Sequence, residues 1–237
     1  MSTGSGDRAP ARGWGGAGES TTLLLVRHGV TAHTVDKRFS GGLASADPPL
    51  SEEGVAQARA TAAWLAPSLP PGTALVTSPV RRTRETAAVL AETWDSAAPS
   101  LEHGFAEMEF GAWDGLTFAE VREQHGADLD AWLGRVDAVA GGHGESFAGV
   151  RERVLEGLGR TLAAHRGRTA VVVSHVTPIK VLVAEALAAP LEAVFRMELA
   201  PASLTVVSYH ADADGGPDRP SLRLYNARPT GAAGPVA

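Results

Sequence analysis

The sequence contains no cysteine, which excludes disulfide bonds, thiolate metal ligands and a cysteine nucleophile. Long apolar runs are also missing. Near the start of the chain the longest run, Leu23 to Val26, is far shorter than the roughly 20 residues of a membrane-spanning helix. Because a chain without disulfides is compatible with a reducing compartment, we expect a cytoplasmic protein that is neither exported nor held in a membrane.

An excess of positive charge is absent too. The chain has 21 Lys and Arg residues against 27 Asp and Glu, a formal net charge of -6. Binding to nucleic acid or to an anionic membrane depends on clustered positive charge. The sequence therefore predicts neither partner, and any phosphate site must concentrate a few basic side chains locally.

The first 20 residues differ from the rest in composition. They are rich in Gly, Ser and Pro, have no apolar period and hold one aromatic residue. Such a segment buries too little surface to offset the entropy lost on ordering. We expect residues 1–20 to be a disordered tail or linker and residues 21–237 to form one domain, since a chain with 44% hydrophobic residues can build one substantial core.

From residue 21 onward, short apolar runs alternate with amphipathic stretches, which favours an α/β protein over a sandwich or a bundle. Strands are expected at 22–26, 74–78 and 169–175, early in 101–115, and in a C-terminal hairpin of 202–210 and 221–226. Helices are expected at 51–66, 79–94, 117–125, 127–135, 146–166 and 178–189, two of them starting at Pro79 and Pro178. The predicted fold is a three-layer α/β/α sandwich with a mixed, mostly parallel central sheet.

Charged residues follow three of these strands. Arg27 and His28 end the first, the stretch 78–84 ends the second, and His175 ends the third. The carboxyl ends of strands in an open α/β sheet form the ligand crevice, so we expect these segments to converge. The helix starts after Ser78 and Thr177 are expected to aim backbone N–H groups into the same crevice, which suits an anion.

Four ordered motifs then resemble one family. LVRHG (25–29), TSPVRRTRETA (77–87), EMEFGAWDG (107–115) and VVSHVTPIK (172–180) are similar to the signatures of the histidine phosphatase superfamily, whose fold is phosphoglycerate mutase-like. One such motif arises by chance, but four in order and in the right contexts are specific. Within the superfamily, FGAWDGLTFAEV (110–121), SHVTPIK (174–180) and RMELAPASL (196–204) resemble the C-terminal acid phosphatase domain of bifunctional ribonuclease H/acid phosphatase proteins.

The resemblance implies roles for four residues. His28 is the implied nucleophile, because a neutral imidazole nitrogen is available near pH 7 when the other ring nitrogen is held by a hydrogen bond. Arg27 and Arg82 match the two arginines that grip the phosphoryl group in place of a metal ion. His175 matches a second histidine that stabilises the moving phosphoryl oxygens.

The resemblance also implies an acid for the leaving group and two outer contacts. Glu107 aligns with the family's general acid, with Glu109 and Glu102 as rivals that spacing alone does not exclude. Arg38 matches an arginine that helps to hold phosphate or substrate, and Ser40 is a weaker candidate contact. The pocket departs from the common pattern at two positions, where Thr34 replaces Asn and Val176 replaces Gly.

The implied function is hydrolysis of small phosphomonoesters through a phosphohistidine, with acid phosphatase as the best label and no cofactor. No His or Cys spacing typical of a metal site occurs. An α-ribazole 5′-phosphate phosphatase is the alternative, and a phosphoglycerate mutase is less favoured because the segment after Glu107 is short. A further alternative, which is not an enzyme, is a phosphate-binding module that has lost catalytic activity. The expected partners are the substrate and a ribonuclease H domain, fused or separate.

Overall fold

A six-stranded mixed sheet forms the centre of the molecule, for which a computed structural model describes residues 20–43, 46–211 and 218–229. The strands are β1 (Ser20–Arg27), β2 (Ala74–Thr77), β3 (Ser100–Leu101), β4 (Thr169–Ser174), β5 (Leu204–His210) and β6 (Arg219–Ala227), in the order β3-β2-β4-β1-β5-β6. Pairings among β1 to β4 are parallel, whereas β5 pairs antiparallel with both β1 and β6. The predicted tail lies outside the described residues, except for Ser20, with which β1 begins.

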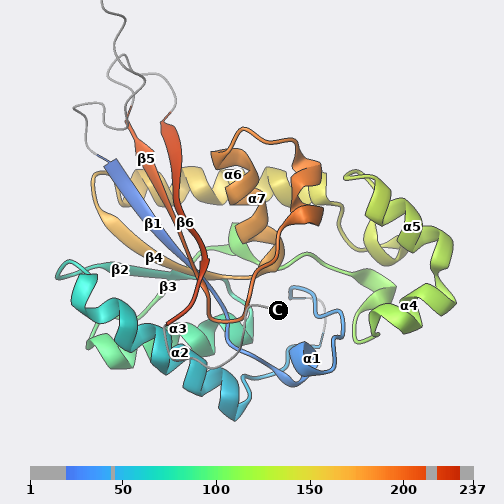
Figure 1. The fold of residues 1–237 in the computed structure, drawn as a ribbon, viewed down its shortest axis with the longest axis horizontal. Coiled ribbons are helices and arrows are strands. Elements are labelled where there is room, and N and C mark those ends of the chain that lie inside the picture. Colours follow the sequence, from blue (N-terminus) through green and yellow to red (C-terminus); the bar gives the residue numbers. More distant parts are fainter. Residues whose placement is uncertain (1–19, 44–45, 212–217, 230–237) are drawn as a thin grey trace, which may run out of the picture.

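Helices cover both faces of the sheet, which confirms the predicted three-layer fold (Figure 1). On one face lie α6 (Phe147–Ala164) and α7 (Val176–Ala186), and on the other lie α2 (Glu52–Leu65) and α3 (Arg81–Trp94). Two short helices, α4 (Phe118–Gln124) and α5 (Gly126–Gly134), lie beyond the end of the sheet, and α1 (Ala32–Val35) follows β1.

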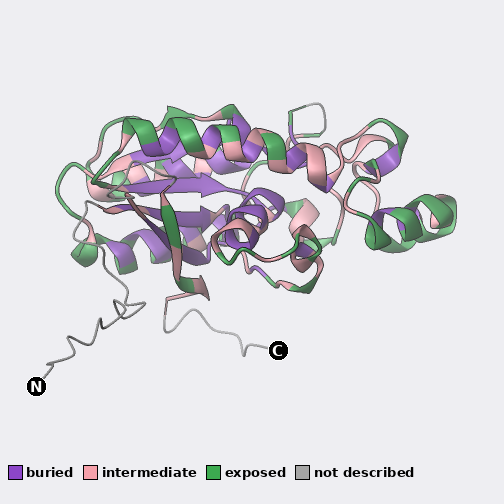
Figure 2. Cartoon of the chain, turned by 90° about the horizontal axis from the view of Figure 1, so that it is seen from above, coloured by how far each residue is buried: buried purple, intermediate pink, exposed green. Residues whose placement is uncertain are grey.

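The two faces follow from the alternation of side chains along a strand. In β1, Leu23 and Leu25 pack with α6 and α7, while Leu24 and Val26 pack with α2 and α3. β4 alternates in the same way, and the central strands and the inner faces of the helices are buried (Figure 2). Burial on both faces explains why the central strands are continuous apolar runs.

Helix starts agree with the sequence where serine caps them and differ where proline was expected to begin them. The hydroxyls of Ser51 and Ser146 each accept a hydrogen bond from a backbone N–H in the first turn of α2 and α6. α3 begins at Arg81, two residues after Pro79, because Val80 is extended. α7 begins at Val176, two residues before Pro178. The first turn tolerates a proline because its N–H groups have no partner within the helix.

The C-terminal hairpin is confirmed, with β5 and β6 antiparallel at the sheet edge. Most of its predicted turn, 212–217, lies outside the described residues. The strand expected early in 101–115 is only the two-residue β3, and the rest of that segment forms 3-10 turns at His103–Phe105 and Gly111–Trp113. Within the described part of the chain, no helix is long and apolar enough to cross a bilayer.

Candidate active site

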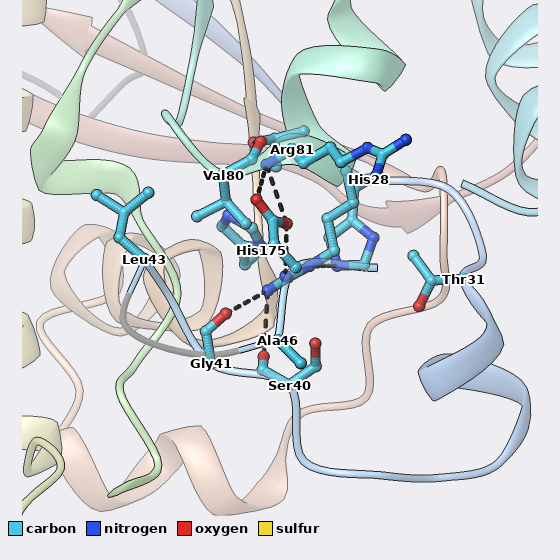
Figure 3. Close-up of polar contacts among 12 residues, drawn as sticks. His28, Thr31, Ser40, Gly41, Leu43, Ala46, Val80, Arg81 and His175 are labelled. Carbon is cyan, nitrogen blue, oxygen red and sulfur yellow. Dashed lines mark hydrogen bonds and ion pairs between the residues drawn. The ribbon is translucent and has the colours of Figure 1, made fainter. Parts of the chain in front are cut away.

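The predicted convergence at the carboxyl ends of the strands is confirmed. His28, Ser78 and His175 each directly follow a strand of the parallel part of the sheet. The backbone N–H of His28 still bonds to Ser174 O at 3.0 Å, and that of Ser78 bonds to Val173 O at 3.0 Å. The rings of His28 and His175 lie side by side, with centroids 5.2 Å apart (Figure 3).

The hydrogen bonds of His28 define one tautomer. Nδ1 lies 2.8 Å from Gly29 O, which can only accept, so Nδ1 carries the proton. Nε2 then has the lone pair, and it accepts a hydrogen bond from Nε of Arg82 at 3.2 Å. Burial, followed by the nearby charges of Arg82 and Arg27, holds the pKa of His28 well below its ordinary 6.5. His28 is therefore a neutral imidazole with its basic nitrogen facing Arg82.

His175 is fully buried and is oriented by a residue to which the sequence assigned no role. Its Nε2 lies 2.8 Å from Oγ of Ser78, a hydroxyl that also accepts a hydrogen bond from the N–H of Val80. Nδ1 of His175 has no hydrogen-bond partner among the described residues. Burial and the charge of Arg82 also hold the pKa of His175 well below 6.5. Nε2 of His175 is thus held by Ser78, and Nδ1 is available to bind a ligand.

Arg82 is 1% exposed and is held at three points. Besides its contact with His28, its Nη2 donates to the carbonyls of Ser40 at 3.1 Å and Gly41 at 3.0 Å (Figure 3). Its Nη1 has no hydrogen bond among the described residues, and Asp47 is 3.9 Å away. The guanidinium is therefore fixed in place, and its Nη1 is available to bind a ligand.

Arg27 lies beside Arg82 and shows the same feature. One of its terminal nitrogens donates to Leu199 O, while its buried Nε has no partner within the described chain. Burial lowers the pKa of Arg27 to about 10, so the guanidinium stays charged at neutral pH. Two cations beside a neutral histidine, with Arg82 buried and Arg27 partly exposed, form a site suited to an anion.

Glu107 shares a cavity with His28, unlike its two rivals, and Glu198 is the other carboxylate among the residues that line this cavity. It is 6% exposed, and its Oε1 accepts from Met108 N at 2.9 Å and Thr177 N at 3.3 Å. Glu102 instead pairs with Arg160 at 2.8 Å, and that contact lowers the Glu102 pKa. Glu109 accepts from Leu43 N at 2.7 Å. Neither rival lines the cavity.

A cavity of about 610 Å³ adjoins the site, and the fully buried His175 is not among the residues that line it. Arg27, His28, Arg82 and Glu107 line it, as do the two predicted outer contacts, Arg38 and Ser40. Ser40 Oγ is buried without a partner among the described residues. Arg38 is already engaged, since its Nη1 donates to Gly115 O at 2.8 Å and lies 3.3 Å from Glu120.

At both helix starts that were expected to aim N–H groups into the crevice, a carboxylate of the chain itself accepts a backbone N–H. The first N–H of α3, at Arg81, donates to both carboxylate oxygens of Asp47 at 3.1 and 2.9 Å (Figure 3). The N–H of Thr177 in α7 donates to Glu107. Carboxylates are stabilised at helix N-termini, so side chains of the chain itself occupy both positions.

Sequence reasoning also missed Arg153 of α6. Its guanidinium donates to the carbonyls of Gly104, Ala106 and Glu107 at 2.8 to 3.0 Å. It also forms a two-point ion pair with Glu145, at 2.7 and 2.8 Å, and Glu145 in turn accepts from Glu109 N. One arginine therefore fixes the loop that carries Glu107. The eight-residue spacing between Glu145 and Arg153 gives no signal for this in the sequence.

Both residues that depart from the family pattern, Thr34 and Val176, line the cavity. Thr34 forms a capping box with Thr31 at the start of α1, so its hydroxyl takes part in a local hydrogen bond. Val176 lines the cavity as the first residue of α7. Neither change removes a charged group from the site.

An α/β fold that brings two histidines and two arginines together at the carboxyl ends of its strands defines a class of phosphoryl-binding proteins. Comparison with known proteins identifies the family. The profile of the histidine phosphatase superfamily (branch 1) matches residues 23–216, so the chain belongs to this superfamily.

The similarity to individual relatives supports this assignment. Over 217 residues, 90% of this chain, it is 39% identical to the bifunctional protein Rv2228c of Mycobacterium tuberculosis, of whose length it spans 56%. It is 34% identical to phosphoserine phosphatase 1 of Hydrogenobacter thermophilus, over 68% of this chain and 73% of that one. The solved structure of a mycobacterial glucosyl-3-phosphoglycerate phosphatase is similar, with a TM-score of 0.75, 30% identity and coverage of 88% of this chain and 99% of that one.

Proposed function

We propose that this chain hydrolyses small phosphomonoesters through a phosphohistidine formed on Nε2 of His28. The observation that carries the proposal is a set of buried polar atoms without hydrogen-bond partners among the described residues. They are Nε of Arg27, Nη1 of Arg82, Nδ1 of His175 and Oγ of Ser40. Buried polar groups are normally paired, so four such atoms on the predicted site residues support a bound oxyanion as the missing partner.

In the first step, the Nε2 lone pair attacks phosphorus and the bond between phosphorus and the ester oxygen breaks. Arg27 and Arg82 offset the negative charge on the phosphoryl oxygens, and Nδ1 of His175 donates to one of them. The leaving oxygen takes a proton from Glu107 and departs as an alcohol. Because Nδ1 of His28 is bonded to Gly29 O, the ring keeps its orientation while it gains charge.

In the second step, water attacks the phosphohistidine. The carboxylate of Glu107 accepts a proton from this water as the phosphorus–nitrogen bond breaks, which releases inorganic phosphate and restores neutral His28. The low pKa of His28 supports the acid phosphatase label, because the ring stays unprotonated and nucleophilic below pH 6.5. The two guanidinium groups supply the charge that a metal ion supplies elsewhere, so we propose that hydrolysis needs no metal.

The test is phosphate release from a panel of phosphomonoesters at pH 5 to 8, with and without EDTA, by wild type and His28→Ala. Phosphoserine and a sugar phosphoglycerate belong in the panel, because two relatives are named for such substrates. We expect turnover that survives the chelator and disappears in His28→Ala, whose circular dichroism should match wild type. Activity that needs an added divalent ion, or full activity in His28→Ala, contradicts the proposal.

A further inference from the structure

Aromatic residues are scarce in this chain and gather at one place. Phe, Trp and Tyr make up 5% of the residues, and there are six phenylalanines. Five of the six line the cavity that holds His28, together with Trp132. The five are Phe39, Phe110, Phe118, Phe147 and Phe195. We call these six rings the aromatic wall.

The aromatic wall is one continuous cluster assembled from separate elements. Phe39, in the loop after α1, lies 4.9 Å from Phe110 and stacks on Phe118 at 6.3 Å between ring centroids. Trp132 of α5 continues the cluster, with Phe147 at 4.9 Å and Phe195 at 6.2 Å. Phe118 and Trp132 come from α4 and α5, which lie beyond the end of the sheet (Figure 1).

Part of this apolar surface is left open to solvent. Phe118, which begins α4, is 46% exposed, and Leu133 of α5, which lines the same cavity, is 37% exposed. Exposed apolar side chains that gather at one cavity mark a binding surface more often than scattered ones do. Here the surface is continuous with the cavity that contains Arg27 and Arg82, so the same occupant can meet both.

We infer that the cavity selects phosphomonoesters whose leaving group carries a flat apolar ring, which packs on the aromatic wall while Arg27 and Arg82 hold the phosphoryl group. This inference rests on the proposed function. It separates the chain from relatives named for phosphoserine and glucosyl-3-phosphoglycerate, whose leaving groups are polar. Burial of one phenyl ring against aromatic side chains favours binding by about 10- to 100-fold.

The experiment compares 2-phenylethyl phosphate with propyl phosphate. Both release primary alcohols of similar basicity, so a difference in kcat/KM reports contacts with the ring and not the chemistry of the leaving oxygen. We expect the phenylethyl ester to be favoured by about 10- to 100-fold. Phe118→Ala and Leu133→Ala should each reduce this ratio several-fold, about as expected for partial loss of a packing surface, and Phe118→Leu should retain most of it. The control is Leu187→Ala, which removes an exposed leucine outside the cavity and should leave the ratio unchanged.

A second measurement makes the test independent of turnover. The dissociation constants of 2-phenylethylphosphonate and propylphosphonate, which cannot be hydrolysed, are compared by calorimetry on the wild type. Tighter binding of the phenylethyl compound with no hydrolysis of any ester supports the aromatic wall and defeats the proposed hydrolysis. Equal constants for the two phosphonates, or a higher kcat/KM for phosphoserine than for 2-phenylethyl phosphate, overturn the inference.

Discussion

At the scale of single residues, Glu107 is tested through the leaving group. A general acid matters in proportion to how poorly the departing oxygen leaves without a proton, and p-nitrophenolate needs none at neutral pH. Glu107→Gln should therefore slow phosphorylation by an alkyl phosphate by about 10²- to 10⁴-fold, and by p-nitrophenyl phosphate much less. Single-turnover kinetics measures the step directly, even if dephosphorylation limits steady-state turnover.

The same experiment has its controls within the chain. Glu102 pairs with Arg160, and Glu109 accepts a hydrogen bond from Leu43 N. Glu102→Gln and Glu109→Gln should therefore not slow phosphorylation unequally for the two leaving groups. If phosphorylation slows equally for both leaving groups in Glu107→Gln, this residue is not the acid. An unequal loss in a neighbour assigns the role to that neighbour.

At the scale of elements, α6 positions the Glu107 loop through Arg153. Arg153→Lys keeps the charge but cannot donate to three carbonyls and both oxygens of Glu145 at once. We expect kcat for alkyl phosphates to fall by about 10-fold or more as Glu107 loses its position, with the Kd for phosphate little changed. This split shows positioning, because a purely structural loss moves both values.

The matched control for α6 is Arg151→Lys, two residues earlier on the same helix. Arg151 pairs with Glu185 of α7, with Nη2 3.0 Å from its carboxylate, so its guanidinium bonds to α7 and not to the Glu107 loop. Equal losses of kcat in Arg151→Lys and Arg153→Lys refute the positioning role.

The sequence predicts the helices and strands well, but it predicts contacts between distant segments of the chain poorly. Periodicity and serine caps place α2 and α6 within two residues of their ends, and the charged residues that follow the strands predict the convergence of His28, Arg82 and His175. Asp47 at the start of α3 and Arg153 behind Glu107 escape prediction, since they act through loop folding and packing that no short spacing encodes. Pro79 lies just before the N-cap of α3 and Pro178 lies within the first turn of α7, so proline marks the start of each helix only to within two residues, because extended backbone and an early helical position both accept proline.

At the scale of the whole molecule, the buried histidines couple stability to pH. His28 and His175 have folded pKa values below their ordinary 6.5, so the unfolded chain binds more protons below that pH. Stability is therefore fully present above about pH 6.5 and is lost as the pH falls toward the folded pKa values. Thermal melting should show Tm falling from pH 7 to pH 5.

The variant for this prediction is His28→Asn/His175→Asn. Its Tm should fall less between pH 7 and pH 5 than that of wild type, because two groups that titrate only in the unfolded chain are gone. Between pH 7.5 and 8.5, where both imidazoles are neutral in either state, the two proteins should have parallel curves. A wild-type slope in the double variant below pH 6.5 contradicts the assignment.

The most direct measurement of the central claim is the site of the phosphoenzyme. The wild type is mixed with a labelled phosphomonoester, quenched within one turnover and cleaved after Arg and Lys, which places His28 in the peptide 28–37 and His175 in 169–180. The account predicts an acid-labile, base-stable label in peptide 28–37, located by fragmentation on His28 and not on His33, and none in His28→Ala. A label in peptide 169–180, or turnover in which no phosphohistidine forms, contradicts it.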